Sequence, residues 1–266
     1  KSHSALQKSG GQTMNNVSQK QEKIYFGLDI SQKTIEIFAL KGEKGVSFGK
    51  ILNNQKSLND FFDEVPFPSE TIAVALETGT HSAWISRLLE SRGYDVIVAH
   101  ARDLAFIYKG DKKSDRIDAE KLARMARADK KLLHPIKVID KKRQEDLLAI
   151  KARDLLVKQR TGIVNAIRGF LRSMGIDDST YSHEVINDIY SELPKEIQEN
   201  LRGLFSALTA IDNNIKEYDK RIRKIAKDYP ETKILQQIKG VGPLIALSFV
   251  LIIGDPHRFS SRECSS

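Results

Sequence analysis

Four acidic residues stand at positions where a metal site can form: Asp29, Glu77, Asp115 and Asp118. Asp29 interrupts a short apolar segment, where an unpaired buried carboxylate is costly. Glu77 directly follows another apolar run, and Asp115 and Asp118 are three residues apart, so they share one face at the start of a predicted helix. Carboxylate oxygens suit Mg2+, and two such ions about 4 Å apart activate a water and stabilise the leaving oxygen in phosphodiester chemistry. The pattern therefore indicates a magnesium site, with two ions possible.

Three of these acids also have a simpler structural interpretation. Asp115 or Asp118 suits the N-cap or the first turn of a helix, where a negative charge interacts favourably with the helix dipole. Glu77 could simply end a strand. Asp29 is harder to explain in this way, so the four acids together favour a site.

Basic residues surround the acidic pair. Residues 109–131 hold nine basic residues against five acidic ones, and the whole chain has 43 Lys and Arg against 35 Asp and Glu, a net charge of +8. Such clustering is typical of a surface that follows a phosphate backbone. We expect the nucleic-acid contacts at Lys109, Lys112, Lys113 and Arg116. The single cysteine, Cys264, and histidines without ligand spacing argue against a zinc site.

The apolar patterning predicts an α/β domain followed by helices. Apolar segments bounded by polar residues predict strands over 24–30, 34–40, 45–52, 71–76 and 95–99, with helices over 57–65 and 82–92. Three strands with short links, then strand–helix–strand, make a mixed sheet. Further helices are predicted over 115–131, 141–174 and 198–228, and the last two suggest an antiparallel coiled-coil arm.

Together these segments give a domain plan. Residues 1–23 are expected to be a disordered or non-native leader, 24–135 the sheet domain, 136–230 the helical arm, and 231–266 the start of a further domain. The longest apolar run, 244–253, is too short to span a bilayer, which predicts a cytoplasmic protein.

Three motifs carry a family resemblance: Gly-Leu-Asp-Ile-Ser over 27–31, Leu-Glu-Thr-Gly-Thr over 76–80 and Lys-Ser-Asp-Arg-Ile-Asp-Ala over 113–119. Their order resembles the DEDD transposases of the insertion-sequence one-ten family, whose relatives include the pilin-gene invertases. The resemblance covers roughly 24–261. It implies a RuvC-like, ribonuclease H-type fold with Asp29, Glu77, Asp115 and Asp118 as magnesium ligands, followed by a coiled coil. It also implies site-specific DNA recombination, a structured guide RNA, dimers or tetramers, and a bacterial or archaeal, nucleoid-associated location.

The segment 235–246 also resembles the family, as a helix-hairpin-helix element. Its glycines, Gly240 and Gly242, let the backbone approach a phosphate, and the next helix offers its N-terminal N–H groups. Lys239 beside them supports a DNA contact, although Gly-Val-Gly-Pro is also a common turn. The family's nucleophilic serine has no counterpart here, because Ser260 and Ser261 come too early, so we expect a C-terminally truncated copy.

Two other functions fit parts of the sequence. A non-catalytic nucleic-acid-binding remnant would use only the arm and the hairpin. Gly27-Leu28-Asp29 in a first strand also opens the sugar kinases and actin-like ATPases, although residues 77–80 are a poor second phosphate loop. His81 could face the acidic cleft, but a histidine at a helix start more often has a structural role.

Overall fold

The computed structural model describes residues 22–100, 114–176 and 188–254. The chain forms two compact units, Lys1–Val138 and Ile139–Ser266, and each is described by itself. The domain boundaries expected from the sequence stay predictions.

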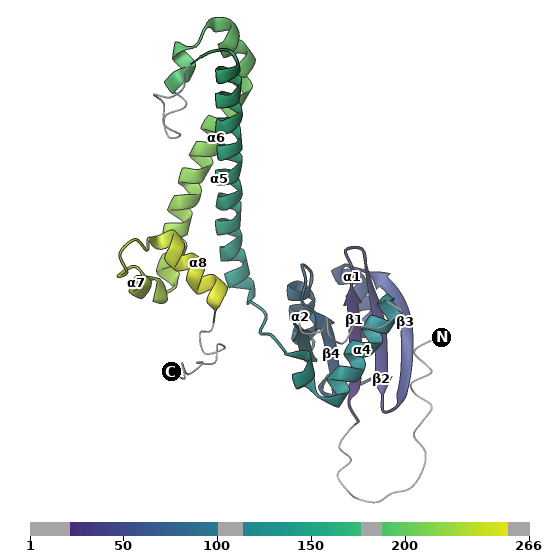
Figure 1. The fold of residues 1–266 in the computed structure, drawn as a ribbon. Helices are drawn as coiled ribbons and strands as arrows, with labels where there is room; N and C mark the ends of the chain where they lie inside the picture. Colours follow the sequence, from purple (N-terminus) through teal and green to yellow (C-terminus); the bar gives the residue numbers. More distant parts are fainter. Residues whose placement is uncertain (1–21, 101–113, 177–187, 255–266) are drawn as a thin grey trace, which may run out of the picture. The chain divides into compact units, whose positions relative to one another are not determined.

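The first unit is built on a five-stranded mixed sheet (Figure 1). Its strands are β1 (Ile24–Ile30), β2 (Thr34–Lys41), β3 (Lys44–Leu52), β4 (Ile72–Glu77) and β5 (Asp95–Ala99). The spatial order is β3-β2-β1-β4-β5. The first three strands pair antiparallel, and β1, β4 and β5 pair in parallel. The predicted mixed α/β sheet is confirmed, and it is consistent with the RuvC-like arrangement.

Helices cover both faces of this sheet. Alternate strand residues such as Phe26, Leu28 and Val74 pack with α1 (Gln55–Asp63) and α2 (Ser82–Ser91) in the main core. On the other face, α4 (Asp115–Ala128) lays its small apolar residues against the strands (Figure 1). Two short 3-10 turns, Ser69–Thr71 and Lys130–Leu133, complete the described elements of this unit.

Local capping explains two differences from the predicted helix bounds. The helix expected over 57–65 begins at Gln55, because the side chain of Asn54 accepts a hydrogen bond from the Ser57 N–H. The helix expected over 115–131 ends at Ala128, because Asp129 has an extended backbone and caps the following turn instead.

The second unit is helical. Two long helices, α5 (Lys141–Ser173) and α6 (Lys195–Ile225), pack antiparallel: Val164, Ile167 and Leu171 of α5 contact the start of α6, and Ile150 contacts its end. Both follow the predicted long helices, and α5 continues through Gly162 and Gly169. The short turns Asp188–Glu192 and Ala226–Asp228 flank α6. The finer description of this pair as a coiled-coil arm stays a prediction.

The region of the predicted helix-hairpin-helix element holds two helices, α7 (Glu231–Leu235) and α8 (Pro243–Ile253), and its assignment as that element stays a prediction. Gly240, with φ of +90°, turns the chain between them, and Pro243 occupies the first turn of α8. In the parts of the chain that the structure describes, no helix combines the length and the apolar character that a membrane span requires.

Candidate metal centre

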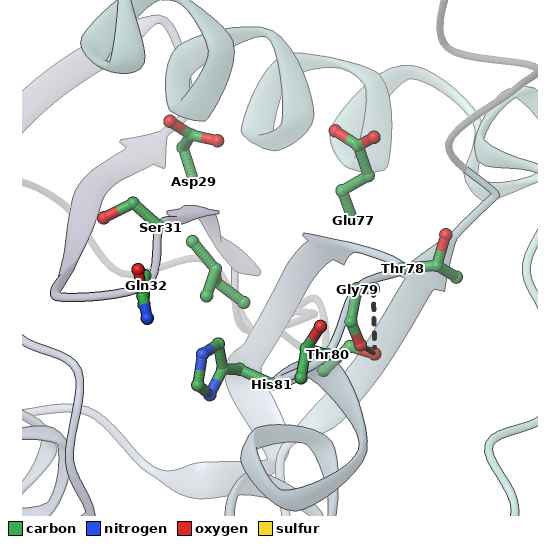
Figure 2. Close-up of a pocket in the computed structure, with 10 residues that line it drawn as sticks. Asp29, Ser31, Gln32, Glu77, Thr78, Gly79, Thr80 and His81 are labelled. Carbon is green, nitrogen blue, oxygen red and sulfur yellow. Dashed lines mark hydrogen bonds between the residues drawn. The ribbon is translucent and has the colours of Figure 1, made fainter. Parts of the chain in front are cut away.

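Two of the predicted acids end neighbouring parallel strands. Leu28 of β1 is paired with Leu76 of β4, and both side chains lie in the main core. The next residues, Asp29 and Glu77, therefore project from the opposite face, at the same edge of the sheet. Figure 2 shows their carboxylates pointing to one side, towards the helix that crosses the sheet. They line a cavity of about 580 Å³, together with the segment 78–82 that leads into α2.

The other two acids lie in the first turn of α4. Ser114 is the N-cap, and its Oγ accepts a hydrogen bond from the Ile117 N–H at 3.4 Å, so neither aspartate is the N-cap, although both are the first-turn acids that the structural interpretation also allowed. Asp118 is buried at 9% exposure, whereas Asp115 is exposed. Both carboxylates raise the pKa of Asp29, which places them within electrostatic reach of it.

A glycine in β1 lets α4 lie this close to the sheet. A Cβ atom at Gly27 would stand 1.9 Å from the carbonyl oxygen of Ala119 and 2.8 Å from the backbone nitrogen of Ala123. Only a residue without a side chain fits between strand and helix backbones at this distance. Gly27 is two residues before Asp29, and Ala119 follows Asp118, so this contact sets the spacing between the two acids.

The carboxylates repel one another. Burial, and then the negative charges of Asp115, Asp118, Glu77 and Glu36, raise the pKa of Asp29 to about 6. Asp118 Oδ1 is buried and has no hydrogen-bond partner among the described residues. Unbalanced negative charge and a buried acceptor without a donor are both relieved by a bound cation.

Glu36 is an acid that the sequence analysis missed. It lies opposite Asp29 in the β1–β2 pairing, is 7% exposed, and accepts a hydrogen bond from Ser47 Oγ at 3.3 Å. It interrupts the apolar strand β2 just as Asp29 interrupts β1. An acidic residue inside an apolar strand was thus the sequence pattern that could have revealed Glu36, since a buried acid is costly without a partner.

Lys50 is the second residue that the sequence analysis missed. Its Nζ contacts Asp115 Oδ2 at 2.5 Å, and it stands beside Glu36 in the β2–β3 pairing. An ammonium group therefore holds a position at the exposed rim of the acidic cluster. Lys50 lies on an exposed edge strand, and nothing in the sequence around it indicated that it would contact an acid of the site.

The donor set suits a divalent cation, although it is not a finished coordination shell. Within residues 22–100, 114–176 and 188–254, no group of three acidic, histidine or cysteine side chains already has the geometry to hold a metal ion. Asp29 and Glu77 nevertheless lie at one edge of the sheet, Asp115 and Asp118 are within electrostatic reach of Asp29, and carboxylates offer only oxygen donors, the kind that Mg2+ prefers.

Comparison with known proteins identifies the family. Residues 26–176 match the family model of the DEDD transposases of the IS110 type, described as "Transposase". The chain belongs to this family. It is 32% identical over 173 residues to the "Transposase for insertion sequence element IS1111A" of Coxiella burnetii, covering 60% of this chain and 45% of that protein. It is 28% identical over 243 residues to the "Putative transposase y4pF/y4sB" of Sinorhizobium fredii, covering 90% and 61%. The chain thus spans about half to three fifths of the length of these relatives.

The family assignment confirms the resemblance inferred from the three motifs, and it decides against a sugar kinase or an actin-like ATPase. All four acids of the DEDD pattern lie inside the matched residues. Their role as metal ligands is taken up below as a proposal.

The expected nucleic-acid contacts of this transposase-family chain are only partly described. Lys109, Lys112 and Lys113 lie outside the described residues. Arg116 is exposed in the first turn of α4, beside Asp115. In the second unit, Lys239 and Gly240 are exposed and Gly242 is half-buried, in the turn before α8.

Proposed function

We propose that this chain acts as a transposase that cleaves and rejoins DNA at the ends of an insertion sequence, with Mg2+ bound by Asp29, Glu77, Asp115 and Asp118. The observation that carries the proposal is that Asp29 and Glu77 end neighbouring parallel strands and that burial, together with the charges of Asp115, Asp118 and Glu77, raises the pKa of Asp29 to about 6. An ordinary structural cluster would pair each carboxylate with a cation or a donor, and Asp118 Oδ1 has neither among the described residues.

The residues suit this chemistry at neutral pH. Mg2+ held there would activate the attacking hydroxyl and stabilise the leaving oxygen of the phosphodiester. With a pKa of about 6, Asp29 is mostly ionised at pH 7 and is ready to bind a cation. Asp118 is fixed by burial against the sheet, while Asp115 is exposed and can exchange its contact with Lys50 for another cation.

The proposal includes DNA and a structured guide RNA as partners, and a dimer or tetramer as the working form. Lys109, Lys112, Lys113 and Arg116 would hold the phosphate backbone near the carboxylates. The turn at Lys239, Gly240 and Gly242 would offer a second phosphate contact, supported by the positive φ of Gly240 and the open N-terminus of α8. We assign no serine nucleophile in this chain.

Neutral isosteres of the acids test the metal site. We expect Asp29→Asn and Asp115→Asn each to weaken Mg2+ binding at least about tenfold by isothermal titration calorimetry, and to abolish Mg2+-dependent DNA binding, with unchanged circular dichroism. Glu90→Gln, which neutralises an exposed acid on α2, is the matched control.

The opposite results would be informative. Unchanged Mg2+ binding in both variants would overturn the proposed metal site. Salt-dependent DNA binding that ignores both Mg2+ and the two substitutions would support the non-catalytic binding function instead.

A further inference from the structure

A histidine shares the cavity with the two strand-end acids. His81 lies just before α2, and its ring lines the cavity on the side away from the carboxylates of Asp29 and Glu77 (Figure 2). It occupies the N-cap position of α2, yet its side chain makes no capping hydrogen bond to that helix. His81 therefore does not cap the helix with its side chain, which is the most common structural role of a polar residue at this position.

One hydrogen bond fixes which nitrogen of His81 can donate. Trp84 Nε1 lies 3.3 Å from His81 Nδ1, and an indole N–H can only donate, so Nδ1 must be the acceptor. A neutral imidazole with an accepting Nδ1 carries its proton on Nε2. Trp84 packs against the main core, so the indole holds the imidazole ring in place.

Several other donors at this cavity are already engaged. The Ser82 hydroxyl donates to the Gly79 carbonyl at 2.8 Å, and the Gly79 N–H donates to Ser82 Oγ at 3.2 Å. The Ser31 hydroxyl donates to the Thr34 carbonyl at 2.9 Å. The segment that faces the carboxylates is thus folded on its own hydrogen bonds, and His81 Nε2–H is a donor that this network leaves for a ligand.

We propose that His81 donates from Nε2 to a non-bridging oxygen of the DNA phosphodiester, and so binds the substrate phosphate beside Asp29 and Glu77. The proposal rests on the proposed function, because a phosphate next to two carboxylates needs the cation that they would hold. It adds the hydrogen-bond donor on the opposite wall, which the carboxylates cannot provide. Trp84 is then a positioning residue that acts through the His81 tautomer.

The tautomer can be read without any enzymatic activity. Long-range proton–nitrogen NMR on the histidine-labelled chain distinguishes the two neutral tautomers, and His81→Gln assigns the His81 signal among the six histidines. We expect His81 to carry its proton on Nε2, and Trp84→Phe to yield a mixture of tautomers. A proton on Nδ1 in the unaltered chain would overturn the proposal.

Binding of a short duplex DNA in the presence of Mg2+ tests the contact itself. We expect His81→Ala to weaken binding about tenfold, as for the loss of a hydrogen bond to a charged group, and His81→Gln to retain part of the affinity through its amide N–H. Trp84→Phe should weaken binding less than His81→Ala. The control is His134→Gln, an exposed histidine that does not line the cavity.

The two proposals fail in different ways. Mg2+-dependent binding that is lost in Asp29→Asn but unchanged in His81→Ala would overturn the role of His81 and leave the proposed function standing. DNA binding by the unaltered chain that does not depend on Mg2+ would overturn both the proposed metal site and the proposed phosphate contact of His81. Equal effects of His81→Ala and His134→Gln would also overturn the specific contact.

Discussion

Replacing Gly27 by alanine tests whether the contact between α4 and β1 builds the acidic site. The substitution adds one methyl group, and it places that group 1.9 Å from the carbonyl oxygen of Ala119 and 2.8 Å from the backbone nitrogen of Ala123. Both neighbours are backbone atoms, so no side-chain rotation can relieve the overlap. Either the helix moves or the strand does.

The size of the effect follows from this geometry. Restoring a carbon–oxygen separation of about 3.2 Å from 1.9 Å requires a shift of about 1.3 Å, and overpacking of this kind costs about 1–3 kcal/mol. The shift would carry Asp118 away from Asp29, because Ala119 is its neighbour on α4. We expect Mg2+ affinity to fall about tenfold or more, since misplacement by 1 Å is expensive in such sites.

The single tryptophan makes the assay specific. Trp84 lies in α2 of the first unit, so its fluorescence during urea unfolding follows the sheet unit alone. We expect a lower unfolding midpoint for Gly27→Ala, and weaker Mg2+ binding by isothermal titration calorimetry. Gly162→Ala makes the same chemical change in α5, where nothing lies within 4 Å of the added Cβ, and should leave both quantities unchanged. Unaltered stability and affinity in Gly27→Ala would refute the claim that this contact spaces the acids.

Three further predictions concern charge and packing. Because the pKa of Asp29 is raised from 3.8 to about 6, the folded state holds its proton more tightly than the unfolded state, so stability should fall as the pH rises from about 4 to about 6. Two pKa units correspond to about 3 kcal/mol of unfolding free energy, which the partial exposure of Asp29 reduces to about 1–2 kcal/mol. Urea unfolding at a series of pH values measures this dependence, and Asp29→Asn should abolish it. If the variant keeps the same pH dependence, Asp29 is not its source. Lys50→Met removes the cation that contacts Asp115 and should raise Mg2+ affinity a few-fold by calorimetry, whereas weaker Mg2+ binding would show that Lys50 supports the site. Leu208→Ala leaves a cavity at a fully buried position between α5 and α6 and should destabilise the helical unit by about 2–5 kcal/mol. The helical circular dichroism signal should then be lost at a lower urea concentration. An unchanged unfolding transition would mean that the two helices do not depend on this packing.

The strands of the sheet could be predicted from the sequence because each is marked by a local pattern of apolar residues. Apolar runs such as 24–30 and 71–76 are bounded by polar residues, and their order along the chain allows few mixed sheets. Asp29 and Glu77 could be assigned to strands for the same reason, since both come at or near the ends of such runs, whereas their common edge follows from the parallel β1–β4 pairing. The long helices were equally clear from their apolar spacing, because neither contains an internal proline.

The remaining features depend on contacts between distant segments. The approach of α4 to Gly27 brings residues about 90 positions apart together, and no local pattern encodes it. Glu36 gains its place from the β1–β2 register, and Lys50 from the β2–β3 register. By contrast, the turn between α7 and α8 was anticipated by the glycines of the predicted helix-hairpin-helix element, and the positive φ of Gly240 turns the chain there; the assignment of that element stays a prediction.

The arrangement explains how carboxylates that repel one another are held close together. Their mutual repulsion favours separation, and it adds to the larger effect of burial in raising the pKa of Asp29. What opposes it is apolar and backbone packing: Leu28 and Leu76 fix the two strand ends in the core, and the glycine contact fixes α4 over them. Lys50 adds charge compensation at the exposed rim only. The sheet and α4 thus bring the acids close together, but a cation bound there would still have to draw their side chains into a coordination shell, since among the described residues no group of three has that geometry.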